Sequence, residues 1–153
     1  MSVERLFFRE GEPASVCFRG ARVVDPRGNL DQIQDLLIEE GVITQVGEPG
    51  SLDMPSGAEE IDCEGLMLLP AFVDPHVHFR TPGQEHKEDL VTGSRAAAAG
   101  GYCAVIAMAN TAPPVDSASI LGALIERAQT EACVPTGFVG CVTKGMQGLE
   151  LSE

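Results

Sequence analysis

The chain has 153 residues, of which 44% are hydrophobic and 22% charged, a composition that excludes a disordered chain and suits one globular domain. Its 10 Lys and Arg against 23 Asp and Glu give a formal net charge of −13, which disfavours binding to nucleic acid or to an anionic membrane. An odd number of cysteines, no signal-like N-terminus and no apolar run of roughly 18 residues lead us to expect a cytoplasmic protein without disulfides or membrane spans.

The first part of the chain has the pattern of short β-strands separated by turns. Glu40 and Gly41 lie between two such stretches and predict a tight hairpin, because glycine readily adopts the positive φ of these turns. Asp35 is expected on a solvated face. We therefore predict a leader at residues 1–15 and a small β-sandwich-like domain at residues 16–67, without a covering helix. The expected strands are residues 16–18, 21–24, 35–39, 42–46 and 60–63.

From about residue 66 the pattern changes to long apolar runs that alternate with helix-like segments. Continuous apolar runs at residues 66–74, 102–108 and 134–142 predict strands buried on both faces. Since buried strands joined by helices form parallel βα units, residues 68–153 are expected to form a parallel α/β domain.

Two helices are expected between these strands. Glu88 and Asp89 fall in the first turn of one helix, where their charges suit the helix dipole. Asp116 or Ser117 is expected to cap the other helix. Residues from Gly148 onward resemble the approach to a third helix. The apolar stripe of the second helix comprises Ile120, Leu121, Leu124, Ile125 and Ala128.

Four polar residues alternate at the end of the first buried strand: Asp74, His76, His78 and Arg80. With a side-chain period of two, they are expected on one face, where two imidazoles can bind one Zn²⁺ ion. Asp74 is expected to support a histidine from behind or to hold the loop. Arg80 offers a permanent charge and a fork suited to a carboxylate, unless it is a surface cation. The alternative for the pair is that two of three histidines fall two apart by coincidence.

Asn110 ends the second buried strand and is expected either to open onto the same rim as a ligand-binding residue or to be an ordinary turn residue. His86 lies in a charged loop and is expected to be solvated rather than a metal ligand. Cys103 and Cys141 are expected to be small core residues, because no spacing indicates a thiolate site.

The chain resembles dihydroorotases, which are cyclic amidohydrolases. Residues 69–80, with residues 82–88, resemble the first barrel strand and loop of that family, and residues 96–102 and 108–114 continue the match in order. The resemblance covers roughly residues 16–150. An Arg directly after the His-x-His pair and the Asn-Thr-x-Pro-Pro stretch are more similar to dihydroorotase than to hydantoinase or allantoinase.

The resemblance implies a zinc amidohydrolase on a (β/α)₈ TIM barrel. Residues 68–153 would then be its incomplete barrel, the first three βα units, and residues 16–67 the N-terminal half of a composite β domain. The implied reaction is the reversible conversion of dihydroorotate to N-carbamoyl-L-aspartate in pyrimidine biosynthesis, in which a metal-activated water attacks the ring amide carbonyl.

The same resemblance assigns roles to four residues. His76 and His78 match the metal-binding pair, for one or two zinc ions, and Arg80 and Asn110 match the residues that hold the substrate carboxylate. The family's acid/base aspartate and its other metal ligands are expected beyond residue 153. No catalytic residue is therefore expected within this chain, and the chain alone is expected to be inactive.

Two departures from the family pattern concern loop geometry and substrate preference: Thr81 stands where Glu is usual, and Ala109 where a Pro commonly precedes the Asn. One alternative function is a non-catalytic dihydroorotase-like scaffold for aspartate transcarbamoylase, and another is a related cyclic amidohydrolase acting on hydantoin or allantoin. The retained histidines favour the enzyme over the scaffold, and Arg80 argues against the second alternative. Besides a small-molecule substrate, the expected partners are a second copy of the chain or aspartate transcarbamoylase.

Overall fold

The computed structural model describes residues 15–153, so the leader expected at residues 1–15 lies outside the described residues except for its last position. The chain divides into two compact units, which are residues 15–70 and Ala71–Glu153 of the described part. The predicted boundary lies between residues 67 and 68. No helix in the described part of the chain is long and apolar enough to cross a membrane.

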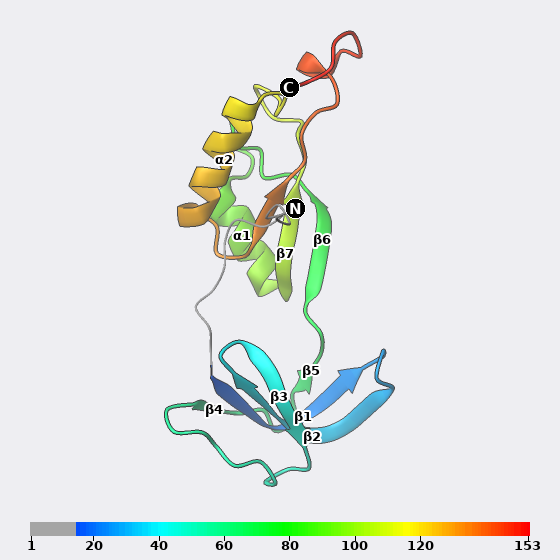
Figure 1. Ribbon diagram of the computed structural model, residues 1–153, viewed down its shortest axis with the longest axis vertical. Coiled ribbons are helices and arrows are strands. Elements are labelled where there is room, and N and C mark those ends of the chain that lie inside the picture. Colours follow the sequence, from blue (N-terminus) through cyan, green and yellow to red (C-terminus); the bar gives the residue numbers. More distant parts are fainter. Residues whose placement is uncertain (1–14) are drawn as a thin grey trace, which may run out of the picture. The chain divides into compact units, whose positions relative to one another are not determined.

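Residues 15–70 fold as one five-stranded sheet (Figure 1). β2 pairs antiparallel with β1 and β3, whereas β4 and β5 pair parallel with successive parts of β1. The described residues therefore form one continuous sheet rather than the two separately paired sheets of the expected sandwich, because every strand joins it through β1 or β2. The strands are β1 (Val16–Asp25), β2 (Leu30–Glu39), β3 (Val42–Gly47), β4 (Glu59–Asp62) and β5 (Met67–Leu68).

Turns and bulges explain where these strands begin and end. Glu40 and Gly41 both have positive φ, 49° and 79°, which confirms the tight hairpin between β2 and β3. A bulge between Phe18 and Ala21 joins two expected short strands into the single strand β1. β2 begins at Leu30, earlier than predicted. The first half of this strand is mostly polar and exposed, so it lacks the apolar alternation from which a strand is predicted.

Asp35 in β2 is buried, with 1% of its surface exposed, and not solvated as expected. Its carboxylate accepts hydrogen bonds of 2.8 Å each from Arg19 Nη1 and from the backbone N–H groups of Gly20 and Gly50. Burial by itself raises the pKa of the Asp35 carboxyl, but these donors outweigh burial and hold the pKa below its ordinary value. Asp35 thus ties the bulge of β1 to the loop that follows β3.

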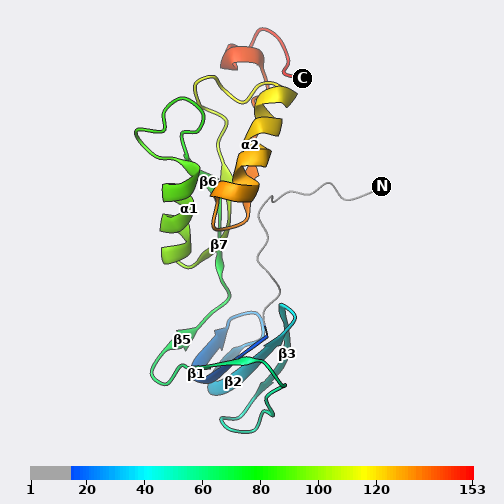
Figure 2. The same ribbon diagram turned by 90° about the vertical axis from the view of Figure 1, so that its left-hand side faces the viewer.

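Ala71–Glu153 forms a three-stranded parallel sheet in the order β6-β7-β8. Both helices cover the same face of this sheet (Figure 2). The alternation of parallel strands and helices confirms the expected α/β class for this unit. Its elements are β6 (Phe72–Val77), α1 (Leu90–Ala99), β7 (Tyr102–Ala107), α2 (Ala118–Glu131), β8 (Thr136–Phe138) and a short 3-10 helix, Lys144–Met146.

The helix starts follow local capping chemistry. Asp89 caps α1: its side chain accepts a 2.7 Å hydrogen bond from Thr92 N, while Thr92 Oγ1 accepts one of 3.2 Å from Asp89 N. Glu88 therefore precedes the helix and does not lie in its first turn as expected. Ser117 precedes α2 as predicted, although its side chain makes no hydrogen bond to the helix backbone. Leu124, at the centre of the predicted apolar stripe, is buried.

The apolar run at residues 66–74 is divided between two strands and is not one buried strand. It supplies β5 to the first sheet and the start of β6 to the second, with Pro70, which has no N–H to donate, between them. β6 is an edge strand among the described residues, and the helices cover one face only. Phe72 and Val73 are consequently each 54% exposed.

The last expected strand is shorter than predicted. β8 pairs with β7 over three residues, and Val142 beyond it is 78% exposed. Where the sequence predicts the approach to a helix, Thr143 and Leu151 form an antiparallel bridge, so the chain turns back on itself. This terminal loop is tied to the segment before α2, because Asp116 Oδ2 accepts a 2.7 Å hydrogen bond from Gly145 N.

Phe79 anchors the chain just after β6 to the core of this unit. Its side chain is 5% exposed and belongs to the same buried cluster as Leu90 of α1 and Val105 of β7. Gly93 of α1 faces the ring so closely that a Cβ atom there would overlap it. The packing of Phe79 therefore fixes the position of the preceding residue, His78.

Candidate active site

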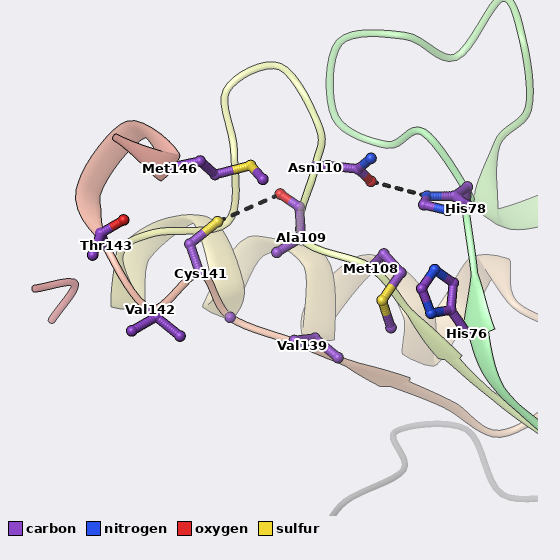
Figure 3. A pocket seen from close by; sticks show the side chains of 11 residues that line it. His76, His78, Met108, Ala109, Asn110, Val139, Cys141, Val142, Thr143 and Met146 are labelled. Carbon is purple, nitrogen blue, oxygen red and sulfur yellow. Dashed lines mark hydrogen bonds between the residues drawn. The ribbon is translucent and has the colours of Figure 1, made fainter. Parts of the chain in front are cut away.

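A pocket of about 450 Å³ opens where the three parallel strands end. Its wall comes from three segments: the end of β6, the residues that follow β7, and the residues that follow β8 together with the terminal loop (Figure 3). Carboxyl ends of parallel strands meet at one edge of a sheet, which is where α/β proteins bind ligands. The lining residues are His76, His78, Met108, Ala109, Asn110, Val139, Gly140, Cys141, Val142, Thr143 and Met146.

His76 and His78 lie side by side in this pocket. Their ring centres are 5.1 Å apart and the rings are nearly perpendicular, with an angle of 70° between their planes. Asp74 Oδ1 accepts a 3.0 Å hydrogen bond from the backbone N–H of His76. Asp74 thus holds the backbone that carries the pair and makes no hydrogen bond to either ring within the described residues.

Asn110 contacts the second of these imidazoles. Its Oδ1 lies 2.9 Å from Nδ1 of His78 (Figure 3). The loop that carries Asn110 is closed by backbone hydrogen bonds from Thr111 N and Val115 N to the carbonyl oxygen of Ala109, at 2.9 and 3.0 Å. The structure thereby brings Asn110 to the same rim as the histidines, as one of the two sequence interpretations predicts.

Arg80 does not share this wall. β6 ends at Val77, and Arg80 has a φ of 58°, so the side-chain alternation expected from residue 74 to residue 80 is broken. The pairing of β6 with β7 also shifts register between Asp74 and Val77, within the stretch that carries these polar residues. Asp74 does not line this pocket but a second hollow among β6, β7 and α1, which His78 also lines. The structure therefore gathers His76, His78 and Asn110, with Arg80 close in sequence but outside the lining.

The two departures from the family pattern take different places. Thr81 is buried, with 3% of its surface exposed, and its hydroxyl donates a 3.3 Å hydrogen bond to the carbonyl oxygen of Phe79. Ala109 is buried as well and lines the pocket beside Asn110. Thr81 therefore acts on the loop backbone, whereas the residue type at position 109 bears on the pocket wall directly.

The terminal loop supplies pocket residues that the sequence analysis does not single out, notably Thr143 and Met146. Cys141, expected to be a core residue, also lines the pocket, and its Sγ lies 3.7 Å from the carbonyl oxygen of Ala109. Burial and the nearby Asp116 carboxylate raise the pKa of this thiol, so it stays protonated. The one sequence signal that points to Cys141, Thr143 and Met146 is their position at or just after the end of the third predicted parallel strand.

Comparison with known proteins identifies the family. Residues 65–153, more than half of the chain, match the family model described as dihydro-orotase-like. This chain belongs to the dihydroorotase-like family. The sequence resemblance to dihydroorotase is thereby confirmed.

Curated relatives of this dihydroorotase-like chain agree with the family match. The dihydroorotase of Citrifermentans bemidjiense is 44% identical over 139 residues, which are 91% of this chain and 32% of the relative. The dihydroorotase of Streptococcus pneumoniae is 42% identical over 135 residues, 88% of this chain and 31% of the relative. The chain thus spans about a third of the length of the curated relatives it matches.

Solved structures share the fold of the dihydroorotase-like chain. An L-hydantoinase from Arthrobacter aurescens superposes with a TM-score of 0.73 at 23% identity, over 85% of this chain and 28% of the other. A dihydropyrimidinase from Brevibacillus agri superposes with a TM-score of 0.67 at 26% identity, over 84% and 27% of the two chains. The likeness to the first shows a shared fold.

The histidine pair of this dihydroorotase-like chain fits a shared metal ion. Two imidazoles bound through nitrogen to one tetrahedral zinc, with Zn–N distances of about 2.0–2.1 Å, have ring centres roughly 5 Å apart. The 5.1 Å separation of His76 and His78 is compatible with this geometry, as it is with ordinary edge-to-face packing of two rings. Among the described residues, no group of three or more His, Cys, Asp or Glu side chains gathers around a common point, so two imidazoles are what this part of the chain offers.

Proposed function

We propose that this chain forms part of the active site of a zinc-dependent dihydroorotase, which interconverts dihydroorotate and N-carbamoyl-L-aspartate. The observation that carries the proposal is the pair of adjacent imidazoles in a pocket at the strand ends, with Asn110 on its rim. The names of the relatives support the same reaction, because the curated relatives of 44% and 42% identity are called dihydroorotases.

In this proposal, His76 and His78 hold the metal ion. When bound, zinc would lower the pKa of a water molecule and polarise an amide carbonyl. Asp74 holds the backbone of His76 and Phe79 holds that of His78, so the backbone that carries both rings is in place before any ligand arrives. The acid/base aspartate and the remaining metal ligands come from outside these 153 residues.

Substrate binding in this proposal depends on Asn110 and Arg80. Asn110 offers amide N–H donors at the pocket rim, and Arg80 offers a guanidinium two residues beyond His78. A local cation matters here because the chain carries a formal charge of −13, whose field opposes an anionic substrate. Because Arg80 lies beyond β6 and does not line the pocket, its side chain has to rotate toward the pocket to reach the substrate carboxylate.

A second candidate is hydrolysis of a hydantoin-type ring by the same metal chemistry. The observation that favours it is that Arg80, the residue expected to select a carboxylate, does not line the pocket. A ring without a carboxylate needs no such cation.

The deciding experiment is an assay of the full-length protein on dihydroorotate, N-carbamoyl-L-aspartate, hydantoin and allantoin. We expect turnover of the first two only, and zinc in the purified protein. His78→Ala should abolish the zinc-dependent activity, whereas His86→Ala, which changes an exposed loop histidine, should not. An unchanged rate in His78→Ala would refute the metal assignment, and a zinc-free, inactive protein would support the scaffold function instead.

A further inference from the structure

The backbone that carries Asn110 is held in place by hydrogen bonds within its loop. Ala109, which precedes it, is buried and accepts two backbone hydrogen bonds, and Thr111 Oγ1 donates a 2.7 Å hydrogen bond to the carbonyl oxygen of Pro113. The loop therefore presents Asn110 to the pocket in a defined direction, toward the ring of His78 (Figure 3).

The 2.9 Å contact between Asn110 Oδ1 and His78 Nδ1 favours a proton on the ring nitrogen that faces the amide oxygen. A carboxamide oxygen accepts hydrogen bonds and donates none, so the nitrogen that faces it must be the N–H donor. A neutral imidazole has one N–H, which leaves Nε2 of His78 with a free lone pair. Within residues 15–153, no hydrogen bond fixes the ring of His76 in this way.

The amide group of Asn110 has a second function available. While Oδ1 accepts from His78, the two N–H donors on Nδ2 have no partner among the described residues, although they lie on the pocket rim. The same planar amide can therefore hold the imidazole through Oδ1 and donate to a ligand oxygen through Nδ2, which fixes the two relative to each other.

We propose that Asn110 is a positioning residue for His78: its Oδ1 holds the imidazole in the Nδ1–H tautomer, so that Nε2 is free to bind a metal ion, while its Nδ2 donors remain available to the ligand. The tautomer follows from the contact itself. The consequences for metal and ligand rest on the proposed function.

The tautomer is tested by NMR of the metal-free, full-length protein with ¹⁵N-labelled histidine side chains, at a pH above the ordinary histidine pKa of about 6.5. The His78 signal is assigned by its loss in His78→Gln, and exposed His86 serves as the reference for an unrestrained ring. We expect the Nδ1–H tautomer at His78, and its loss in Asn110→Ala. Thr143→Ala, which truncates another pocket side chain, should leave it unchanged. An Nε2–H tautomer at His78, or no change in Asn110→Ala, would overturn the inference.

Zinc titration provides the second readout. Asn110→Ala should lower zinc affinity by about 10- to 100-fold, the usual effect of removing a partner that orients a metal-binding histidine. Asn110→Asp keeps the acceptor and should keep zinc affinity, but it removes the N–H donors and should raise KM for dihydroorotate. Equal zinc affinity in the wild type and Asn110→Ala would contradict the positioning role while leaving the proposed function intact. Absence of zinc binding in the wild type, with the expected tautomer present, would contradict the proposed function and leave the tautomer assignment standing.

Discussion

His78 is a candidate metal ligand whose backbone is held by core packing and whose ring is held by a hydrogen bond. It follows directly after β6, and its neighbour Phe79 is buried in the core, so its backbone is fixed although the strand has ended. Its ring contacts Asn110 on one side and lies 5.1 Å from that of His76 on the other. A polar ring fixed by both packing and a hydrogen bond is preorganised, which is the condition a metal ligand has to meet.

Arg80 is proposed to bind the substrate carboxylate although it does not line the pocket, so kinetics have to test its role. In the full-length protein, Arg80→Lys is expected to raise KM for dihydroorotate about 10-fold with little change in kcat, because a point charge replaces a bidentate fork and one charge-assisted hydrogen bond is worth roughly 1.5 kcal/mol. Steady-state kinetics measure the effect, and Arg95→Lys on the exposed surface of α1 is the control. An unaltered KM would remove Arg80 from the substrate site.

Asp35 allows a prediction about stability rather than catalysis. Asp35→Asn weakens the hydrogen bonds from Arg19, Gly20 and Gly50 and is expected to lower the free energy of unfolding by about 1–3 kcal/mol, as for other buried polar groups that lose a partner. Because the pKa of Asp35 is lower in the folded state, its contribution is complete above the unfolded pKa of about 3.9 and is lost as the pH falls below it.

The measurement is urea unfolding at neutral pH and at a series of acidic pH values. The difference in unfolding free energy between the wild type and Asp35→Asn should shrink as the pH falls through the acidic range. Asp31→Asn is a matched control, because Asp31 also pairs with an arginine but is half exposed, so its effect should be within about 1 kcal/mol. A constant difference at every pH would show that the Asp35 charge does not contribute.

At the scale of the elements, the sequence predicts local order well and long-range placement poorly. The Glu40-Gly41 hairpin, the strand β7 and the apolar stripe of α2 follow from periodicity and turn chemistry, which are local properties. The division of the apolar run at residues 66–74 between β5 and β6 cannot be predicted in this way, because a continuous apolar stretch has the same pattern whether it joins one sheet or two.

The same limit applies to the candidate site. The pairing of His76 with His78 follows from strand alternation, and the approach of Asn110 follows from parallel topology. The displacement of Arg80 depends on the register shift between Asp74 and Val77 and on the burial of Phe79, which come from tertiary contacts with α1 and β7. The burial of Asp35 is of the same kind, since one of its donors comes from the bulge of β1 and another from the loop after β3, and no sequence period describes either.

Helix α1 provides a prediction about how an element supports the site. Gly93→Ala places a methyl group against the ring of Phe79 and is expected to destabilise the protein by about 1–3 kcal/mol through overpacking. Gly122→Ala is the matched change in α2, where a Cβ meets nothing within 4 Å, and it should stabilise by about 0.5–1 kcal/mol because alanine is the better helix former. Thermal unfolding of both variants checks the opposite signs. Because Phe79 positions His78, Gly93→Ala should also weaken zinc binding, and Gly122→Ala should not.

At the scale of the whole molecule, much apolar surface is left exposed. β6 and β8 are edges of the sheet in the described part of the chain, and helices cover one face only. Such edges and apolar surfaces favour association with further chain or with other copies. In the unit Ala71–Glu153, the most exposed large apolar side chains are Phe72, Val73, Val142, Met146, Leu149 and Leu151.

The last prediction concerns the 153 residues by themselves. A catalytic zinc site has three protein ligands and an open position, whereas the described residues offer two neighbouring imidazoles and no group of three ligating side chains. The chain also spans about a third of the length of the dihydroorotases it matches. We therefore expect the isolated chain to show no dihydroorotase turnover and to bind zinc far more weakly than the full-length protein, as measured by a coupled assay and by competition with a chelator. His78→Ala should lower that weak affinity further, because one imidazole replaces two. Turnover by the isolated chain, with full-length enzyme excluded by mass spectrometry, would show that these residues complete the site without further ligands.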